Sequence, residues 1–317
     1  MAVKKVFYFD SSDGIHKIHS VLWEPKNISV IGVIQIAHGM TEHIERYGLF
    51  AEFMCDYGFI VTGNNHLGHG GSVTTEDEWG FFARKDGFGF LVKDMYTLKT
   101  IIRKEYPKVP YFLLGHSMGS FLSRIFISRY GEELNGAIIM GTANQPKTVV
   151  RLGKFIAGVI AQFKGLNYRS QLIHSMAAGG YNKSFEPSKT PYDWLSKDEK
   201  IVREYHGDKR CTFVFTVSAY RDMFDGLIEI ADKKSIMRIP KTLPIYLAAG
   251  AKDPVGNFGK GVEQVFNMYK SAGIKDLSIK LYANDRHEIL NETDKAIVYE
   301  DLLTWIRQRC PYPQLTK

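Results

Sequence analysis

Long hydrophobic runs, cysteines and a leader-like start are scarce or missing in this sequence of 317 residues. Every apolar run is shorter than the ~18 residues that span a bilayer, so we expect no transmembrane helix. Two lysines near the start are followed by Asp10 before an adequate apolar stretch, so we expect no signal peptide. Three widely spaced cysteines form neither a zinc-type cluster nor a disulfide framework. These absences predict a cytoplasmic protein.

Positive charge is in modest excess over negative charge in this sequence. The chain carries 41 Lys and Arg against 34 Asp and Glu, and 44% of its residues are hydrophobic, which is typical of a globular protein. Nearly all of the excess lies in residues 143–240, with 16 basic and 10 acidic residues. No recognisable nucleic-acid-binding module accompanies it, so we expect no nucleic-acid partner. A solvated basic face is the favoured interpretation, and attraction of an anionic lipid or substrate is the alternative.

Apolar runs alternate with helical patterns along most of the chain. A hairpin is expected over residues 6–23, where two alternating segments flank a Ser-Ser-Asp-Gly turn. Further strands are expected at 30–37, 59–63, 111–114, 137–140, 244–249 and 277–282, and helices at 46–57, 88–106, 118–130, 261–272 and 293–309. Strands that alternate with helices of this length predict an α/β fold with a mostly parallel sheet.

The alternation stops between residues 143 and 238, where the pattern is helical and irregular. We therefore expect a core made of residues 1–142 and 239–317. A helical insertion, residues 143–238, precedes the last two strands.

The segment Gly115-His116-Ser117-Met118-Gly119 has the form G-x-S-x-G. The pattern alone is weak, but here it lies directly between an expected buried strand and an expected helix, where a nucleophile elbow must be. Glycines on both sides allow a strained turn that exposes a serine hydroxyl above the sheet. Ser117 is thus the candidate nucleophile.

A serine hydroxyl needs a base to take its proton, and the base needs an orienting acid. In this architecture the acid and then the histidine follow the serine along the chain. Asp253 comes just after the strand at 244–249, and His287 just after the strand at 277–282. All three candidates follow strands at the carboxyl edge of the sheet, where open α/β sheets place their sites.

An acyl-transfer site also needs two N–H donors for the oxyanion. The backbone amide of Met118 opens the helix after Ser117 and can supply one. His38-Gly39-Met40 follows the strand at 30–37, so the Met40 amide is the second candidate.

These residues resemble the α/β-hydrolase superfamily, and within it the monoacylglycerol lipase and lysophospholipase group of S33-type hydrolases. The residues that carry the resemblance are His38-Gly39-Met40-Thr41-Glu42-His43 with Arg46-Tyr47, His66-Leu67-Gly68-His69-Gly70-Gly71-Ser72, and the elbow. The resemblance implies a mostly parallel eight-stranded sheet with helices on both faces, and a helical cap at residues 143–238. It implies Ser117, His287 and Asp253 as catalytic residues, an oxyanion hole at Met40 and Met118, and no cofactor or metal.

Glu42 and Arg46 are four residues apart and can pair on a helical face. The resemblance places them near the alcohol end of a substrate, and bracing of their loop is the alternative. His66 and His69 are spaced like a metal pair, but their glycine-rich turn favours roles as hydrogen-bonding loop residues. Two positions depart from the group: Asn65 stands where Asp is usual, and Thr41 where Gly is common.

Apolar residues recur at helical spacing near the start of the insertion, at Leu152, Phe155, Ile156, Val159, Ile160 and Phe163, beside basic residues. Such a helix either docks on a membrane or micelle or packs on the core.

The leading hypothesis is a serine ester hydrolase that acts through an acyl-enzyme on monoacylglycerol, lysophospholipid or similar small-molecule acyl esters. An iminopeptidase-type peptidase or an acyltransferase would use the same three residues. A low-turnover ligand-binding module on a hydrolase fold is the alternative from another class.

Overall fold

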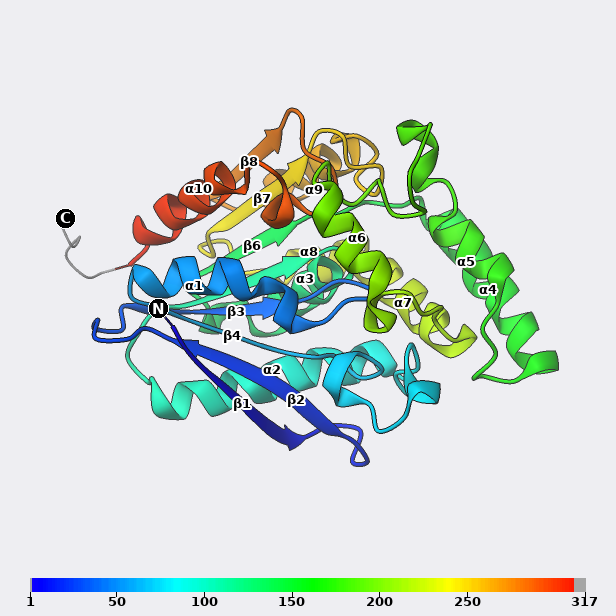
Figure 1. The fold of residues 1–317 in the computed structure, drawn as a ribbon, viewed down its shortest axis with the longest axis horizontal. Helices are drawn as coiled ribbons and strands as arrows, with labels where there is room; N and C mark the ends of the chain where they lie inside the picture. Colours follow the sequence, from blue (N-terminus) through cyan, green and yellow to red (C-terminus); the bar gives the residue numbers. More distant parts are fainter. Residues whose placement is uncertain (1, 311–317) are drawn as a thin grey trace.

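The computed structural model describes residues 2–310, and a single eight-stranded sheet runs through them (Figure 1). The strand order is β1-β2-β4-β3-β5-β6-β7-β8. Strands β3 to β8 pair in parallel, whereas β1 and β2 form an antiparallel hairpin whose second strand pairs with β4. The strands are β1 (Val3–Asp10), β2 (Lys17–Glu24), β3 (Gly32–Ala37), β4 (Phe59–Asn64), β5 (Tyr111–His116), β6 (Gly136–Met140), β7 (Ile245–Gly250) and β8 (Leu277–Tyr282).

Helices cover both faces of this sheet. Outside the insertion they are α1 (Gly48–Asp56), α2 (Gly87–Glu105), α3 (Met118–Tyr130), α9 (Lys260–Ser271) and α10 (Lys295–Arg307). Buried residues of α1 and α10 belong to one apolar core, and those of α2, α3 and α9 belong to the other. The parallel strands lie between two helical layers.

Strand β5 shows why the central strands are mostly apolar. Successive side chains of a strand point to opposite faces, so Tyr111 and Leu113 enter one core while Phe112 and Leu114 enter the other. All six of its residues are buried. A strand that is covered on both faces needs apolar residues at every position, which is the pattern expected for parallel sheets.

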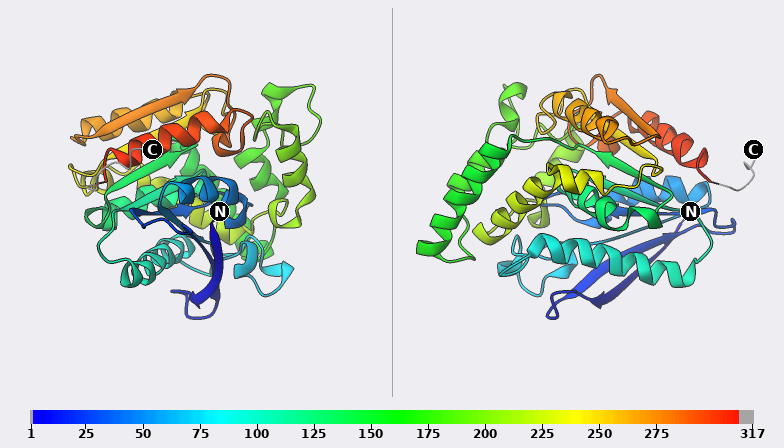
Figure 2. Two further views of the ribbon diagram at one scale, coloured as in Figure 1. Left: turned by 60° about the vertical axis from the view of Figure 1, so that its left-hand side comes forward. Right: turned by 180° about the vertical axis from the view of Figure 1, so that it is seen from behind.

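Five α-helices lie between β6 and β7, in the insertion. They are α4 (Lys147–Lys164), α5 (Gln171–Ala178), α6 (Glu199–Gly207), α7 (Val217–Ile230) and α8 (Lys233–Met237). Helix α7 packs against α2 and α3 of the sheet layer and carries α4 on its other side. Figures 1 and 2 show α4 and α5 along the outer edge of the molecule.

The expected order of strands and helices is confirmed, with small shifts in their ends. The helix expected at 46–57 consists of a short 3-10 helix, Ile44–Tyr47, followed by α1. No helix of the described residues is both long and apolar enough to cross a membrane.

Candidate active site

Ser117 occupies the turn between β5 and α3 in a backbone conformation that side chains rarely adopt. Its φ is 55° and its ψ is −122°. The neighbouring glycines make the turn sterically possible: a Cβ at Gly115 would lie 2.4 Å from the Gly119 carbonyl oxygen, and one at Gly119 would lie 2.0 Å from the Ala37 carbonyl oxygen. The turn therefore has the strained geometry that presents a serine at the carboxyl edge of a sheet.

Asp253 and His287 are brought together by the loops after β7 and β8. The Nδ1 atom of His287 lies 2.9 Å from Oδ2 of Asp253, and both side chains are almost completely buried. The other carboxylate oxygen of Asp253 accepts the Val255 amide at 2.9 Å. A carboxylate accepts in such a contact, so Nδ1 is the donating nitrogen of His287 and Nε2 is the ring nitrogen that Asp253 leaves free for a partner.

A glycine permits the close approach of these two loops. A Cβ at Gly250, the last residue of β7, would lie 2.2 Å from the carbonyl oxygen of Asp285 and 2.1 Å from that of Arg286. The loop that carries His287 is thus packed directly on the end of β7. No larger residue fits without moving that loop.

The elbow and the loop of His287 are connected through His116, the residue before Ser117. The ring of His116 lies 4.7 Å from the ring of His287, its Nε2 atom donates to the His287 carbonyl at 3.1 Å, and a Cβ at Gly141 would meet both rings. Within residues 2–310 the structure gives no hydrogen bond between the Ser117 hydroxyl and Nε2 of His287. The predicted base and acid are therefore in contact, whereas the predicted nucleophile is the neighbour in sequence of a residue that contacts the base. A hydrogen bond between a nucleophile and its base is often long before a substrate binds.

The loop after β3 approaches Ser117 closely. A Cβ at Gly39 would lie 3.0 Å from the Cβ atom of Ser117. His38 holds this loop: its Nδ1 donates to the Gly39 carbonyl at 2.8 Å, and its Nε2 accepts the His66 amide at 3.0 Å. Burial lowers the pKa of His38 to about 4. The ring stays neutral near pH 7 and can donate and accept at once. Met40, half-buried, follows directly.

His66 and His69 act as hydrogen-bonding loop residues, which is the interpretation favoured from their glycine-rich setting. Nε2 of His66 donates to the His38 carbonyl at 3.2 Å, and Nδ1 of His69 donates to the Leu67 carbonyl at 3.0 Å. Burial lowers the pKa of His66 well below its ordinary value, and that of His69 to about 3. Both rings are therefore neutral near pH 7.

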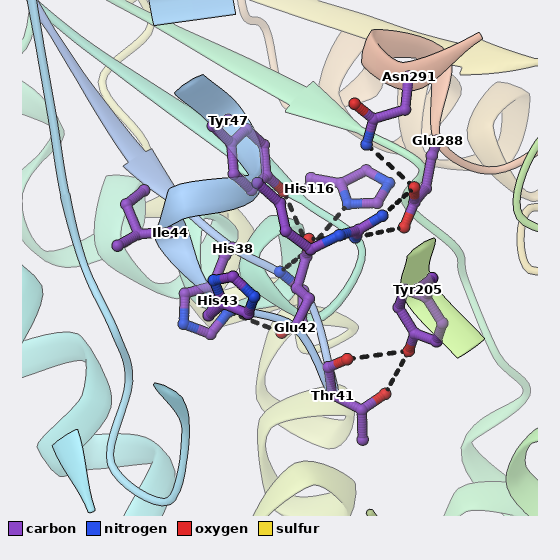
Figure 3. Close-up of polar contacts among 12 residues, drawn as sticks. His38, Thr41, Glu42, His43, Ile44, Tyr47, His116, Tyr205, Glu288 and Asn291 are labelled. Carbon is purple, nitrogen blue, oxygen red and sulfur yellow. Dashed lines mark hydrogen bonds and ion pairs between the residues drawn. The ribbon is translucent and has the colours of Figure 1, made fainter. Parts of the chain in front are cut away.

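A buried carboxylate, Glu42, connects the loops of this site (Figure 3). One oxygen accepts from the Gly39 amide, from the Tyr47 hydroxyl at 3.0 Å and from Nδ1 of His116 at 3.3 Å, and the other accepts from Arg46 at 2.9 Å. Burial alone would raise the pKa of Glu42, but the hydrogen bond from His116 and the charge of Arg46 outweigh it and hold that pKa well below its usual range. Glu42 is thus a fixed negative charge.

Arg46 extends the network to the loop of the candidate base. Its two terminal nitrogens donate to the two oxygens of Glu288, both at 2.6 Å, in the fork geometry that favours arginine over lysine. Asn291 donates to Glu288 at 3.0 Å. The network therefore joins the loop after β3, the elbow and the residue after His287.

Glu42 and Arg46 are the residues that the resemblance places at the alcohol end of a substrate. In the structure the Glu42 carboxylate and the Arg46 guanidinium are both bonded to other protein groups, and their contact with a substrate stays a prediction. Two further residues of the network were missed in the sequence. His116 and Glu288 were not singled out, although each adjoins a candidate catalytic residue. Their positions next to Ser117 and His287 were the available signal.

A segment of the insertion supports the His287 loop. The Glu288 amide donates to the Leu195 carbonyl at 2.7 Å, and the ring of Trp194 lies 5.0 Å from that of His287. Lys197 forms ion pairs with Asp285 at 2.6 Å and Asp294 at 2.9 Å. The insertion is therefore part of the site.

Two groups of side chains in the described chain have the residue types of a metal site. One is His43, Asp208 and Cys211, and the other is Asp285, Glu292 and Asp294. In the first, Asp208 is bonded to Arg210 at 2.6 Å and to His43 at 3.1 Å. In the second, Lys197 pairs with Asp285 and Asp294. Each group thus already contacts a cationic side chain of the protein.

Comparisons with known proteins show the family and the fold of this chain. The model of the family described as serine aminopeptidase, S33, matches residues 29–294. The monoacylglycerol lipase of Mycolicibacterium smegmatis is 25% identical over 301 residues, which cover 94% of this chain and 95% of the relative. The monoglyceride lipase of Rattus norvegicus is 25% identical over 294 residues, with 90% and 86% covered.

Solved structures show the same fold. A thermostable carboxyl esterase from Bacillus coagulans, in complex with glycerol, has a TM-score of 0.89 at 29% identity and covers 97% of this chain and 99% of its own. A soluble variant of the Saccharomyces cerevisiae monoglyceride lipase has a TM-score of 0.79 at 18% identity, with 98% and 97% covered. The expected α/β-hydrolase fold is confirmed.

Replacing Glu42 by Gln is expected to lower the free energy of unfolding by about 3 kcal/mol or more, because it removes the anion from several buried donors and leaves Arg46 with one of its two carboxylate partners. Chemical denaturation measures this loss. Glu52→Gln is the matched control, since Glu52 is exposed on α1, and it should change stability by less than about 0.5 kcal/mol. Equal effects of the two variants would contradict the central role of Glu42.

His116 is expected to make the stability depend on pH. Burial disfavours its charged form, but the hydrogen bond and charge of Glu42 outweigh burial and raise the pKa of His116 above 6.5. Its contribution is then fully present below pH 6.5 and is lost as the pH rises through the folded-state pKa. The stability difference between wild type and His116→Gln should shrink from pH 6 to pH 9. A difference that grows with pH would contradict this assignment.

Proposed function

The chain belongs to the serine aminopeptidase S33 family of α/β hydrolases, and we propose that it hydrolyses monoacylglycerols, lysophospholipids or similar acyl esters through an acyl-enzyme. It is a serine hydrolase with the ester-hydrolase character of the relatives it matches. The single observation that carries the proposal is the buried Asp253–His287 hydrogen bond beside the strained Ser117 elbow.

In the proposed reaction the Ser117 hydroxyl attacks the ester carbonyl while Nε2 of His287 takes its proton. Asp253 holds His287 in the tautomer this requires and stabilises the imidazolium that forms. The Met40 and Met118 amides donate to the oxyanion. His287 then gives its proton to the leaving alcohol, and a water activated by the same histidine releases the acid.

The substrate class rests on the relatives rather than on a bound molecule. Two of them are named as monoacylglycerol or monoglyceride lipases, and the Bacillus coagulans esterase was solved with glycerol. The two lipase names give an acyl ester of glycerol as the substrate, and the esterase binds glycerol, the alcohol part of such an ester. We therefore expect small alcohol groups and medium or long acyl chains to be favoured.

We further propose that residues 143–238 form a lid over a core of residues 1–142 and 239–317, and that the lid contacts membranes. On α4, Val150, Gly153 and Ala157 are buried, and the helix packs on α7 of the same insertion. The opposite side of α4 and α5 exposes Val149, Leu152, Phe155, Phe163, Leu172 and Met176, with Phe163 80% exposed. Most of the apolar face expected from the sequence is thus exposed, and only Ile156 and Ile160 of that face are half-buried.

Charge supports an anionic lipid surface as the partner of this apolar face. Lys147, Arg151 and Lys164 are exposed on α4 among the apolar side chains. An exposed apolar face with basic residues at its border is typical of a helix that lies in a membrane interface. A cytoplasmic location with peripheral membrane contact follows as part of the proposal. It is supported by the three free thiols, Cys55, Cys211 and Cys310.

Replacing Ser117 by Ala should reduce kcat/KM for p-nitrophenyl esters by at least about 10³-fold, because the nucleophile is lost while the fold is kept. In the wild type, the rate should be highest at acyl chains of eight carbons or longer. A series from C2 to C16 measures both. An optimum at C2 to C4 would contradict the lipid-like substrate, and full activity of Ser117→Ala would contradict the nucleophile.

The double substitution Phe155→Ser/Phe163→Ser should weaken binding to phosphatidylglycerol vesicles by about tenfold, because it removes apolar area from the face proposed to enter the lipid. Co-sedimentation measures binding, and hydrolysis of a C4 ester should stay within about twofold. Ile15→Ser is the matched control, since Ile15 is 82% exposed in the β1–β2 turn. Equal vesicle binding by wild type and the double variant would contradict the lid surface.

A further inference from the structure

Thr41, the residue after Met40, has a backbone conformation that is costly for its side chain. Its φ is 49°, in the left-handed region that favours glycine. A residue branched at Cβ is uncommon there, and such strain costs on the order of 1–3 kcal/mol. Strain of this size persists only where neighbouring groups hold the residue.

The group that holds Thr41 comes from the insertion. The Tyr205 hydroxyl, on α6, donates to the Thr41 carbonyl at 2.9 Å and lies 2.8 Å from the Thr41 hydroxyl, from which it can accept (Figure 3). One phenol thus fixes the main chain and the side chain of Thr41 together. The two residues are 164 positions apart in sequence.

The side chain of Tyr205 is itself held in place by its neighbours. Its side chain is buried, the Arg46 guanidinium covers its ring at 4.8 Å, and the ring of Tyr192 lies 5.0 Å away. The first turn of α6 is capped by Asp198, whose carboxylate accepts the Lys200 amide at 3.0 Å. Burial raises the pKa of Tyr205 well above its ordinary value, so the phenol is neutral and can donate and accept at the same time.

We propose that Tyr205 is a positioning residue for the oxyanion hole: its hydroxyl holds Thr41 in the left-handed conformation and thereby fixes the direction of the neighbouring Met40 amide. This inference rests on the proposed function, in which the Met40 amide stabilises the oxyanion. If Tyr205 holds Thr41 in this way, the oxyanion hole is complete only while α6 lies against the loop after β3. The position of the insertion is then coupled to the chemical step for every ester, whatever its acyl chain.

The first test is Tyr205→Phe, which keeps the ring and removes one oxygen. We expect kcat to fall by about 10- to 100-fold, below the 10²–10³-fold that a lost oxyanion donor costs, because the Met40 amide is displaced rather than removed. KM should change by less than about threefold. The loss should be the same for C4 and C8 p-nitrophenyl esters, whereas loss of an acyl-chain contact would differ between them.

The decisive test is rescue by glycine at position 41. Glycine adopts positive φ at little cost, so the loop no longer needs the phenol to hold it. In the Tyr205→Phe background, Thr41→Gly should restore kcat to within about threefold of that of the Thr41→Gly variant alone. Destabilisation of the insertion in general would not be repaired by this change.

Tyr192→Phe is the matched control for loss of a phenol oxygen in the same part of the insertion. Within residues 2–310 the Tyr192 hydroxyl makes no hydrogen bond, so its removal should change kcat by less than about twofold.

Thr41→Val tests the contact between the Thr41 and Tyr205 hydroxyls from the Thr41 side. It removes the Thr41 hydroxyl and keeps the branched Cβ, and its effect on kcat should be less than additive with that of Tyr205→Phe.

The outcomes are distinguishable. Unchanged kcat in Tyr205→Phe, or failure of Thr41→Gly to restore it, would overturn the positioning role. If Tyr205→Phe does not fold, Thr41→Val alone tests the contact, and an unchanged kcat in that variant would overturn the positioning role instead. A wild-type protein that hydrolyses no ester would overturn the proposed function rather than this inference.

Discussion

The whole site depends on the buried negative charge of Glu42. A carboxylate placed in a protein interior is costly unless charged and polar donors surround it. Here the donors come from the loop after β3, the elbow and Arg46, and Arg46 continues to Glu288 in the loop after β8. Moving any one of these loops would leave a charge or a donor unpaired. The network therefore penalises every arrangement of the loops except the observed one.

The insertion has two parts, one that contacts the loops joined by Glu42 and Arg46 and one that does not. Residues around Trp194 and Lys197, together with α6, pack on the loops of the site, and their contacts are polar and specific. Helices α4 and α5, at the outer edge of the molecule (Figure 2), carry the exposed apolar residues instead. An account in which the entire insertion moves as one lid would have to break the contacts of the first part at each turnover. Movement confined to α4 and α5 would not.

Sequence reasoning predicted what local patterns can encode. The nearly continuous apolar runs predicted β3 and β5, and the glycines around Ser117 indicated a strained turn because they let neighbouring backbones pass closely. The placement of Asp253 and His287 after successive strands followed from the rule for open sheets. The partners of Glu42 could not be read in this way, because Glu288 is separated from Arg46 by 242 residues and Tyr205 from Thr41 by 164. Contacts at such separations leave no periodicity or spacing in the sequence. Thr41 was seen as a departure from a common glycine, but its compensation by a phenol was visible only in three dimensions.

The central claim is that Ser117 is a nucleophile activated by His287. Mass spectrometry after reaction with a fluorophosphonate tests it most directly, because the reagent forms a stable adduct with the activated serine. The account predicts one adduct per chain, mapped to the peptide that contains Ser117, and none in a His287→Asn variant under the same conditions. An adduct on another residue, or equal modification of Ser117 without His287, would contradict it.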